Sequence, residues 1–140
     1  LRQKYSNEPG LAHSIICTND KDQKFSVKLN EVLNEHMTDT DFSVNDFAGI
    51  MGLGRTVFYK KERGVTGYSP YEYLRVMRMK KAAEMLLTED LTIAEVAYSV
   101  GINDPFYFSK CFKNQFGVSP SAYRKKLSED ENEPINDADV

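Results

Sequence analysis

Two short segments of the sequence carry side chains suited to reading the edges of nucleic-acid bases. In each segment, basic, hydroxyl and aromatic groups recur at helical spacing: Arg55, Thr56, Tyr59 and Lys60 in the first, and Phe106, Ser109 and Lys110 in the second. Arginine and lysine donate to guanine O6 and N7, hydroxyls bond several base atoms, and aromatic rings pack on the thymine methyl group. We therefore expect these residues to contact base edges.

A second set of basic residues suits the phosphate backbone, where contacts position a protein without reading sequence. This set consists of Lys61, Arg63, Lys113, Arg124, Lys125 and Lys126. Basic residues on a helix most often form only a solvated face, and this alternative applies to Arg55 and Lys60 as well. An internal repeat argues against it.

The segment from 43 to 53 is repeated in character from 92 to 102. Both copies begin with a hydroxyl residue, Ser43 or Thr92, and place an acid three positions later, Asp46 or Glu95. This is the capping-box pattern that starts a helix. Each copy then has an alanine, which allows close helix approach, and four positions later a glycine, which adopts φ > 0 without strain.

The second halves of the two copies also match, with one extra residue in the second copy. Phe58 corresponds to Phe108, and the Gly-x-Ser-Pro runs at 67–70 and 117–120 coincide. We place the extra residue in the turn before, or at the start of, the second helix of that copy. Each copy predicts one helix-turn-helix unit, and the units span 43–66 and 92–116.

The outer helix of each unit is expected over about 54–65 and about 104–116. In the latter, Phe108, Phe112 and Phe116 recur every four residues and predict its core side. Between the units, an apolar stripe after a Ser-Pro start predicts a connecting helix over about 69–88. Its length of roughly 30 Å is close to the ~34 Å between successive major grooves on one face of DNA.

The ends of the chain differ in charge from its middle. Residues 38–127 carry 13 basic and 10 acidic side chains, whereas residues 128–140 carry six acids and no Lys or Arg. We predict that 128–140 form a disordered acidic tail, which either only solubilises the protein or regulates it. We predict that residues 1–22 form a linker from a preceding domain. An amphipathic helix from about 23 to 37 would begin the main domain, 23–127.

Few residues suit catalysis or metal binding. Cys17 and Cys111 lie far apart and are expected to be reduced thiols, with a disulfide as the less favoured alternative. His13 and His36 have no partner at a metal-ligand spacing, and no stretch approaches the roughly 18 apolar residues of a membrane helix. We expect a cytoplasmic, non-enzymatic fragment without cofactor or metal, cut from a longer protein that is itself cytoplasmic or membrane-anchored.

The second copy of the repeat resembles the signature of the AraC/XylS family of bacterial transcription regulators. The resemblance rests on Thr92–Ala97, Gly101, Asn103–Lys110, Phe112–Lys113, Phe116–Pro120 and Tyr123–Arg124, and it covers about Phe42 to Lys126. It implies an all-α fold of about seven helices, in which a long linker helix joins two helix-turn-helix subdomains. The base-reading positions it implies are Arg55, Thr56, Tyr59, Lys60, Pro105, Phe106, Ser109 and Lys110. One departure is Glu62, because the family usually has an apolar residue there.

The segment before this region resembles the one that joins a receiver domain to such an output domain in hybrid two-component proteins of the Bacteroides type. The resemblance implies sequence-specific binding of double-stranded DNA and transcription regulation, most simply activation. RNA polymerase and the preceding receiver and kinase domains are the implied partners. A protein-interaction module that docks RNA polymerase or a partner regulator is the alternative. An enzyme fragment is a third interpretation, although no nucleophile–base pair supports it.

Overall fold

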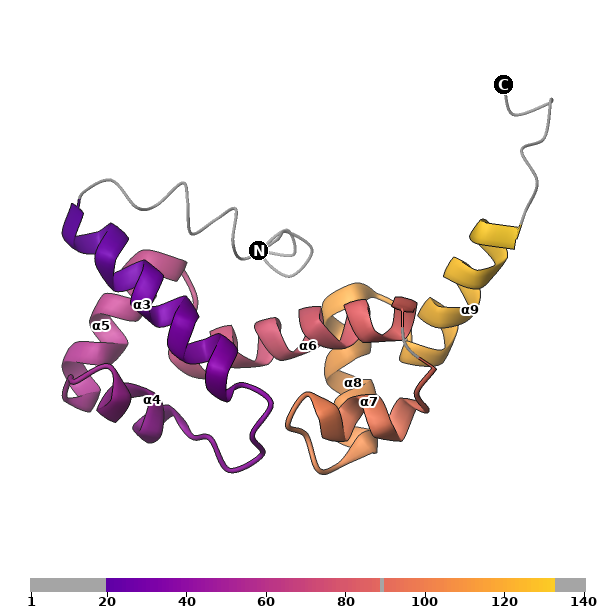
Figure 1. The fold of residues 1–140 in the computed structure, drawn as a ribbon, viewed down its shortest axis with the longest axis horizontal. Helices are drawn as coiled ribbons and strands as arrows, with labels where there is room; N and C mark the ends of the chain where they lie inside the picture. The colour runs from indigo at the N-terminus through magenta and orange to yellow at the C-terminus, as the bar shows by residue number, and fades with distance from the viewer. Residues whose placement is uncertain (1–19, 89, 133–140) are drawn as a thin grey trace, which may run out of the picture.

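The structure is a computed structural model that describes residues 20–88 and 90–132. Within these ranges the chain forms seven helices joined by turns and contains no strand, which confirms the predicted all-α fold with about seven helices. The helices are α3 (Asp20–His36), α4 (Val44–Ile50), α5 (Arg55–Thr66), α6 (Pro70–Thr88), α7 (Ile93–Ser99), α8 (Pro105–Phe116) and α9 (Pro120–Asn132). Figure 1 shows α6 running between a lobe that contains α3, α4 and α5 and a lobe that contains α7, α8 and α9.

The first lobe encloses its own hydrophobic core. Aromatic rings of α4 and α5 meet at its centre, where the Phe47 and Phe58 ring centroids are 5.0 Å apart and both side chains are fully buried. Leu29 and Leu33 cover them from α3, and Tyr73 closes the core from α6. A buried side chain of this size stabilises a fold by roughly 1.5–3 kcal/mol, so α3 is an integral part of the first unit.

The second lobe has a separate core, built on the predicted phenylalanine stripe of α8. Phe108 and Phe112 are fully buried, and Phe116 lies partly buried against the same cluster, which confirms the predicted core side of this helix. Val96 and Ala97 of α7 pack on them. Both helix-turn-helix units therefore present the opposite face of their second helix to solvent.

Both predicted capping boxes are present. The Ser43 and Thr92 hydroxyl oxygens accept hydrogen bonds from the backbone N–H groups of Asp46 and Glu95, each at 3.1 Å. The two carboxylates accept in return from the backbone N–H groups of Ser43 and Thr92, at 3.1 and 2.9 Å. These bonds satisfy N–H groups that a helix start leaves unpaired.

The turns inside the two units differ as the repeat predicts. Residues 51–54 join α4 to α5, whereas residues 100–104 join α7 to α8, so the second turn is one residue longer. In both turns the predicted glycine has a positive φ, 75° at Gly52 and 86° at Gly101. The one-residue slip in the repeat is thus a longer turn in the second unit.

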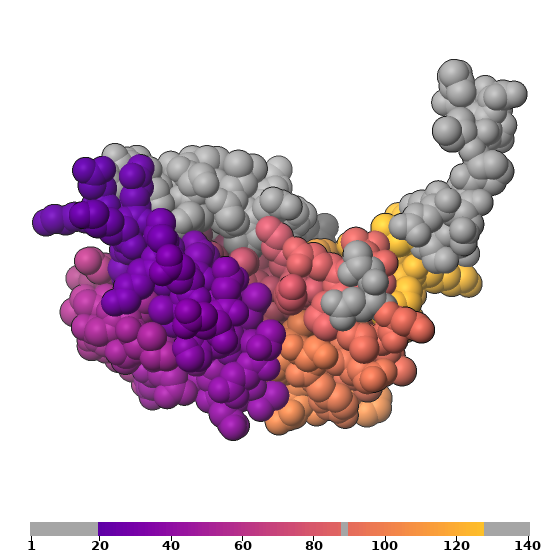
Figure 2. All heavy atoms as spheres, in the orientation of Figure 1, coloured from indigo at the N-terminus to yellow at the C-terminus, as the bar shows by residue number. Residues whose placement is uncertain are grey.

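Helix α6 belongs to both cores. Tyr73, Leu74 and Val76 are buried in the first core, and the buried residues from Met79 to Leu86 lie in the second. The helix starts at Pro70, as predicted from the Ser-Pro pair, and its 19 residues extend roughly 29 Å. The lobes also touch directly, since Figure 2 shows the segment after α3 against the second lobe.

Two predicted boundaries were wrong. Helix α3 begins at Asp20 rather than near 23, and α9 continues to Asn132, so that residues 128–132 are helical and not disordered. Lys and Glu are good helix formers, and extending an existing helix is cheap compared with starting one. The rest of the predicted linker and tail, residues 1–19 and 133–140, lies outside the described residues. None of the described helices is both long and apolar enough to span a membrane.

Candidate nucleic-acid interface

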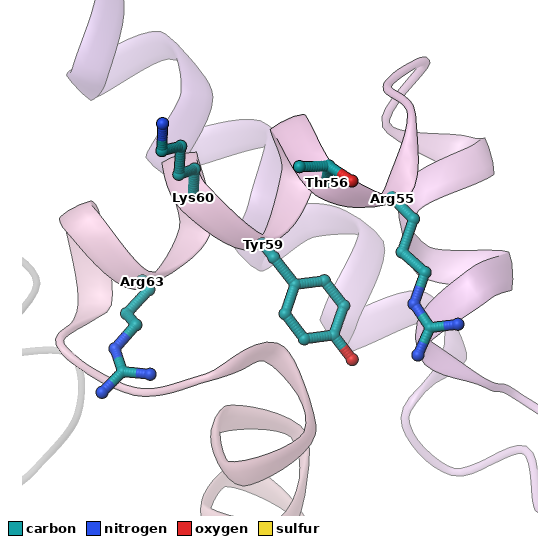
Figure 3. Close-up of a pocket in the computed structure, with 5 residues that line it drawn as sticks. All are labelled: Arg55, Thr56, Tyr59, Lys60 and Arg63. Atoms are coloured by element: carbon teal, nitrogen blue, oxygen red, sulfur yellow. The ribbon is translucent and has the colours of Figure 1, made fainter.

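Helix α5 carries all four residues of the first set of predicted base readers. Arg55, Thr56 and Lys60 are exposed, and Tyr59 is half-buried because its ring packs on the first core. Together with Arg63 they line a shallow groove of about 420 Å³. In Figure 3, Arg55, Tyr59 and Arg63 extend from one side of the helix, while Lys60 points away from them.

The groove on α5 combines positive charge with an aromatic surface. The Arg55 guanidinium carbon lies 5.5 Å from the centre of the Tyr59 ring, a cation–π arrangement that orients the arginine along the helix. Arg63, predicted as a phosphate contact, lines the same groove as the predicted base readers. The sequence signal for this grouping is the spacing of four residues between Arg55, Tyr59 and Arg63, which places them on one helix face.

Helix α8 presents the second set. Asp104 caps its N-terminus, with the carboxylate accepting from the backbone N–H groups of Phe106 and Tyr107 at 3.0 and 3.3 Å, and Pro105 follows as the first helical residue. Phe106 is 89% exposed, although an isolated ring of this size normally avoids water. Lys110 is exposed and Ser109 is half-buried on the same side of the helix.

Polar contacts hold α8 against α6. The Gln115 amide donates to the backbone carbonyl of Val76 at 3.1 Å in a buried position. Nearer the start of α8, the Tyr107 hydroxyl lies 3.1 Å from the Tyr71 hydroxyl. Hydrogen bonding to Tyr71 and then to Cys111 raises the pKa of Tyr107 above its usual range. Cys111 is a buried free thiol, as expected, and Cys17 lies outside the described residues.

The predicted phosphate contacts occupy different environments. Lys113, Lys125 and Lys126 are exposed. Lys61 is exposed too, but its ammonium group lies 5.5 Å from the Phe25 ring of α3. Arg124 is partly buried, and its Nε donates to the Leu86 carbonyl at 3.4 Å. Since Leu86 belongs to the last turn of α6, Arg124 satisfies a carbonyl that the helix end leaves free.

Glu62 is the departure from the apolar pattern, and the structure buries it completely. Its Oε2 accepts a hydrogen bond from the Thr66 hydroxyl at 2.9 Å, while its Oε1 is buried with no partner among the described residues. Burial raises the pKa of Glu62 to about 8, the Thr66 hydrogen bond opposes this rise, and the nearby Glu72 carboxylate adds to it. The first unit therefore contains a carboxyl group in an apolar site.

Comparison with known proteins identifies the family. A family model described as a helix-turn-helix domain matches residues 47–126, and the chain belongs to this family of AraC-type DNA-binding domains. The chain is 33% identical over 129 residues to histidine kinase P4 of Formosa agariphila, covering 92% of this chain and 9% of that protein. It is 45% identical over 84 residues to the Msm operon regulatory protein of Streptococcus mutans, covering 60% and 30%.

A solved structure agrees with both the fold and the family. The DNA-binding domain of AdpA, a global transcriptional factor crystallised with a target DNA, is 28% identical, with a TM-score of 0.69 over 79% of this chain and 96% of that chain. The chain spans less than a third of the two relatives named above. The family is one of DNA-binding domains and not an enzyme family.

Replacing the buried carboxyl should stabilise the protein in a pH-dependent way. Because the pKa of Glu62 is about 8 in the folded chain and 4.5 ordinarily, the native state holds a proton that the unfolded state releases between these values. The contribution of Glu62 to stability is therefore most favourable below pH 4.5 and falls as the pH rises to about 8. We expect Glu62→Leu to raise the free energy of unfolding at pH 8.5 by on the order of 1 kcal/mol or more, with a smaller gain at pH 5.

The matched control is Glu31→Leu, because Glu31 is an exposed glutamate on α3 in the same lobe. Denaturant unfolding at the two pH values measures both variants. A gain for Glu62→Leu that is equal at pH 5 and pH 8.5 would contradict a raised pKa, and a loss at both would mean that the carboxylate is usefully paired.

Proposed function

We propose that this chain is the DNA-binding output module of a transcription regulator, and that α5 and α8 enter successive major grooves on one face of the duplex. One observation carries the proposal. Two units of the same construction each turn an open helix face outward, and each face holds a cation together with an exposed or half-buried ring: Arg55 and Tyr59 on α5, Lys110 and Phe106 on α8. Such faces can pair with base edges and with thymine methyl groups.

The length of α6 supports simultaneous reading by both units. Its roughly 29 Å approaches the ~34 Å between major grooves one helical turn apart. Lys61, Lys113, Lys125 and Lys126 would contact phosphates beside the grooves. Arg63 lines the groove on α5 and would contact DNA beside the base readers. Arg124 would have to give up its hydrogen bond to the Leu86 carbonyl to reach DNA.

The two reading faces are chemically different, so the DNA site should be asymmetric. Arg55, Thr56, Tyr59 and Lys60 offer two cations and two hydroxyls, whereas α8 offers the Pro105–Phe106 apolar surface with Ser109 and Lys110. An arginine or lysine suits guanine, and an apolar surface suits the thymine methyl group. We expect a monomer to bind a non-palindromic site, and a dimer to bind two such sites.

The similarity to a protein named a histidine kinase, of which this chain covers only a small part, supports a two-component setting. In that setting, receiver and kinase domains precede the chain in a longer protein, and phosphorylation of the receiver controls DNA binding by this module in the cytoplasm. The name of the AdpA relative, a global transcriptional factor, favours transcription regulation as the output. Activation through RNA polymerase is the form of regulation we propose.

The competing function is a protein-interaction module in which α5 and α8 dock a protein partner. The exposed Phe106 ring suits either role. Phosphate contacts release counterions, so DNA binding by six or so cations should weaken steeply with salt. A specific duplex bound with a salt slope near zero would favour the protein partner.

Footprinting tests simultaneous reading directly. A duplex selected from a random library with the wild-type chain should show two protected segments about 10 base pairs apart. Inserting about five base pairs between them turns one groove to the far side, so affinity should fall toward the non-specific level, by about 10³-fold. Equal binding to the original and the extended duplex would mean that one unit reads DNA alone.

Two lysines of the second unit should have different effects on sequence preference. Lys110→Ala should cost about 1–3 kcal/mol and relax the preference at one or two base pairs, because Lys110 lies on the reading face. Lys125→Ala is the matched control on α9 and should weaken all sequences about equally. Site selection with both variants measures this, and the reverse pattern would overturn the assignment of reader and phosphate contact.

A further inference from the structure

One arginine lies where three segments distant in sequence meet. Arg78, on the middle of α6, donates from Nε to the Met37 carbonyl at 2.7 Å and from Nη2 to the Asp39 carbonyl at 2.8 Å. Met37 and Asp39 follow α3 in the first lobe. On the other side lies Gly101, in the turn of the second unit, where an added Cβ would be 3.1 Å from Arg78 Nη2.

The same glycine brings the two lobes into direct contact. A Cβ at Gly101 would lie 2.8 Å from the Met37 carbonyl oxygen, which is closer than real Cβ contacts, and Gly101 also has a φ of 86°. The turn of the second unit therefore packs on the backbone of the first lobe. We call Arg78, Met37, Asp39 and Gly101 the joint.

Among the described residues, the joint is a polar contact that links the two lobes away from the axis of α6. The two hydrophobic cores are separate, and α6 contributes to both. A single helix leaves its two ends free to bend and twist relative to each other, since long helices curve easily. A guanidinium fits this task because its planar fork offers donors in fixed directions to two carbonyls. Burial in the joint lowers the pKa of Arg78 from its ordinary value, while the Asp39 carboxylate opposes that shift.

We propose that Arg78 is a positioning residue that holds the two helix-turn-helix units at a fixed angle and thereby determines the spacing between the two DNA segments they read. Arg78 reaches no base and no phosphate in this role. Instead, its two hydrogen bonds orient the first lobe against the second-unit turn, so that α5 and α8 face DNA in a single relative arrangement. The inference rests on the proposed function, because it supposes that both units read DNA at once.

Loosening the joint should widen the range of spacings between the two DNA segments that the protein accepts. It should change the base-pair preference within each segment much less. Two units held at a fixed angle lose their relative freedom of motion when the protein folds. A loosely joined pair loses that entropy when it binds DNA, which weakens binding. A loose pair can also reach segments at other spacings. Arg78→Met keeps the aliphatic stem and removes both hydrogen bonds. Lys81→Met is the matched control, because Lys81 is an exposed cation on the same helix.

The test measures affinity for the selected duplex and for versions with about one to five base pairs added between the protected segments. For the wild type and Lys81→Met we expect a steep fall with each insertion. For Arg78→Met we expect about tenfold weaker binding to the original duplex and a flattened profile, with at least tenfold less discrimination against the extended duplexes. A profile as steep as that of the wild type would overturn the proposal.

A measurement without DNA separates this inference from the proposed function. Spin labels at Lys61→Cys on α5 and Lys113→Cys on α8, with Cys17→Ser and Cys111→Ala, report the distance between the recognition helices. Arg78→Met should broaden a narrow wild-type distribution, and an unchanged distribution would refute the joint whatever the DNA results are. If the wild type binds no duplex at two segments, the proposed function fails, while the broadening still tests the joint.

Circular dichroism first establishes that each variant is folded. Should Arg78→Met lose its helical signal, Arg78→Lys replaces it, since one ammonium cannot donate to both carbonyls with the geometry of the fork. Arg78→Lys is then expected to show the flattened profile and the broadened distance distribution, and wild-type behaviour in both would count against the proposal.

Discussion

Helix α6 has to bury side chains in two cores whose helices otherwise scarcely meet. Its first half supplies Tyr73 and Val76 to one core, and its second half supplies Met79 and Leu86 to the other. Each unit can therefore complete its core only by packing on the shared helix. The shared helix α6 and the contact at Arg78 together orient α5 relative to α8.

The reading faces are possible because the opposite side of each recognition helix is well anchored. Phe58 anchors α5 in one core, and Phe108 and Phe112 anchor α8 in the other. The Asp104 side chain caps the start of α8, so the exposed residues of its first turn have defined directions, whereas α5 begins after Gly54 without a side-chain cap. The Phe106 ring is 89% exposed on the open side of α8 and so offers an apolar surface there.

The features that the sequence predicted correctly are those that leave a local pattern in it. The paired caps, the slip in the turn and the phenylalanine stripe each leave a local pattern, and all three are confirmed. Arg78 reads from sequence as one more cation on the basic side of a helix, because its acceptors are backbone carbonyls some 40 residues away that leave no pattern. The acids of 128–132 favoured disorder by composition, while the helix already under way from Pro120 continues through them.

If the chain holds two different recognition helices in a single arrangement that matches successive major grooves, both helices enter the duplex at once. A crystal structure of the chain on its selected duplex measures this most directly. We expect α5 and α8 in grooves about one helical turn apart, with Arg78 still donating to the carbonyls of Met37 and Asp39. A complex in which only one of these helices enters a groove, or in which the lobes have separated at Arg78, would contradict it.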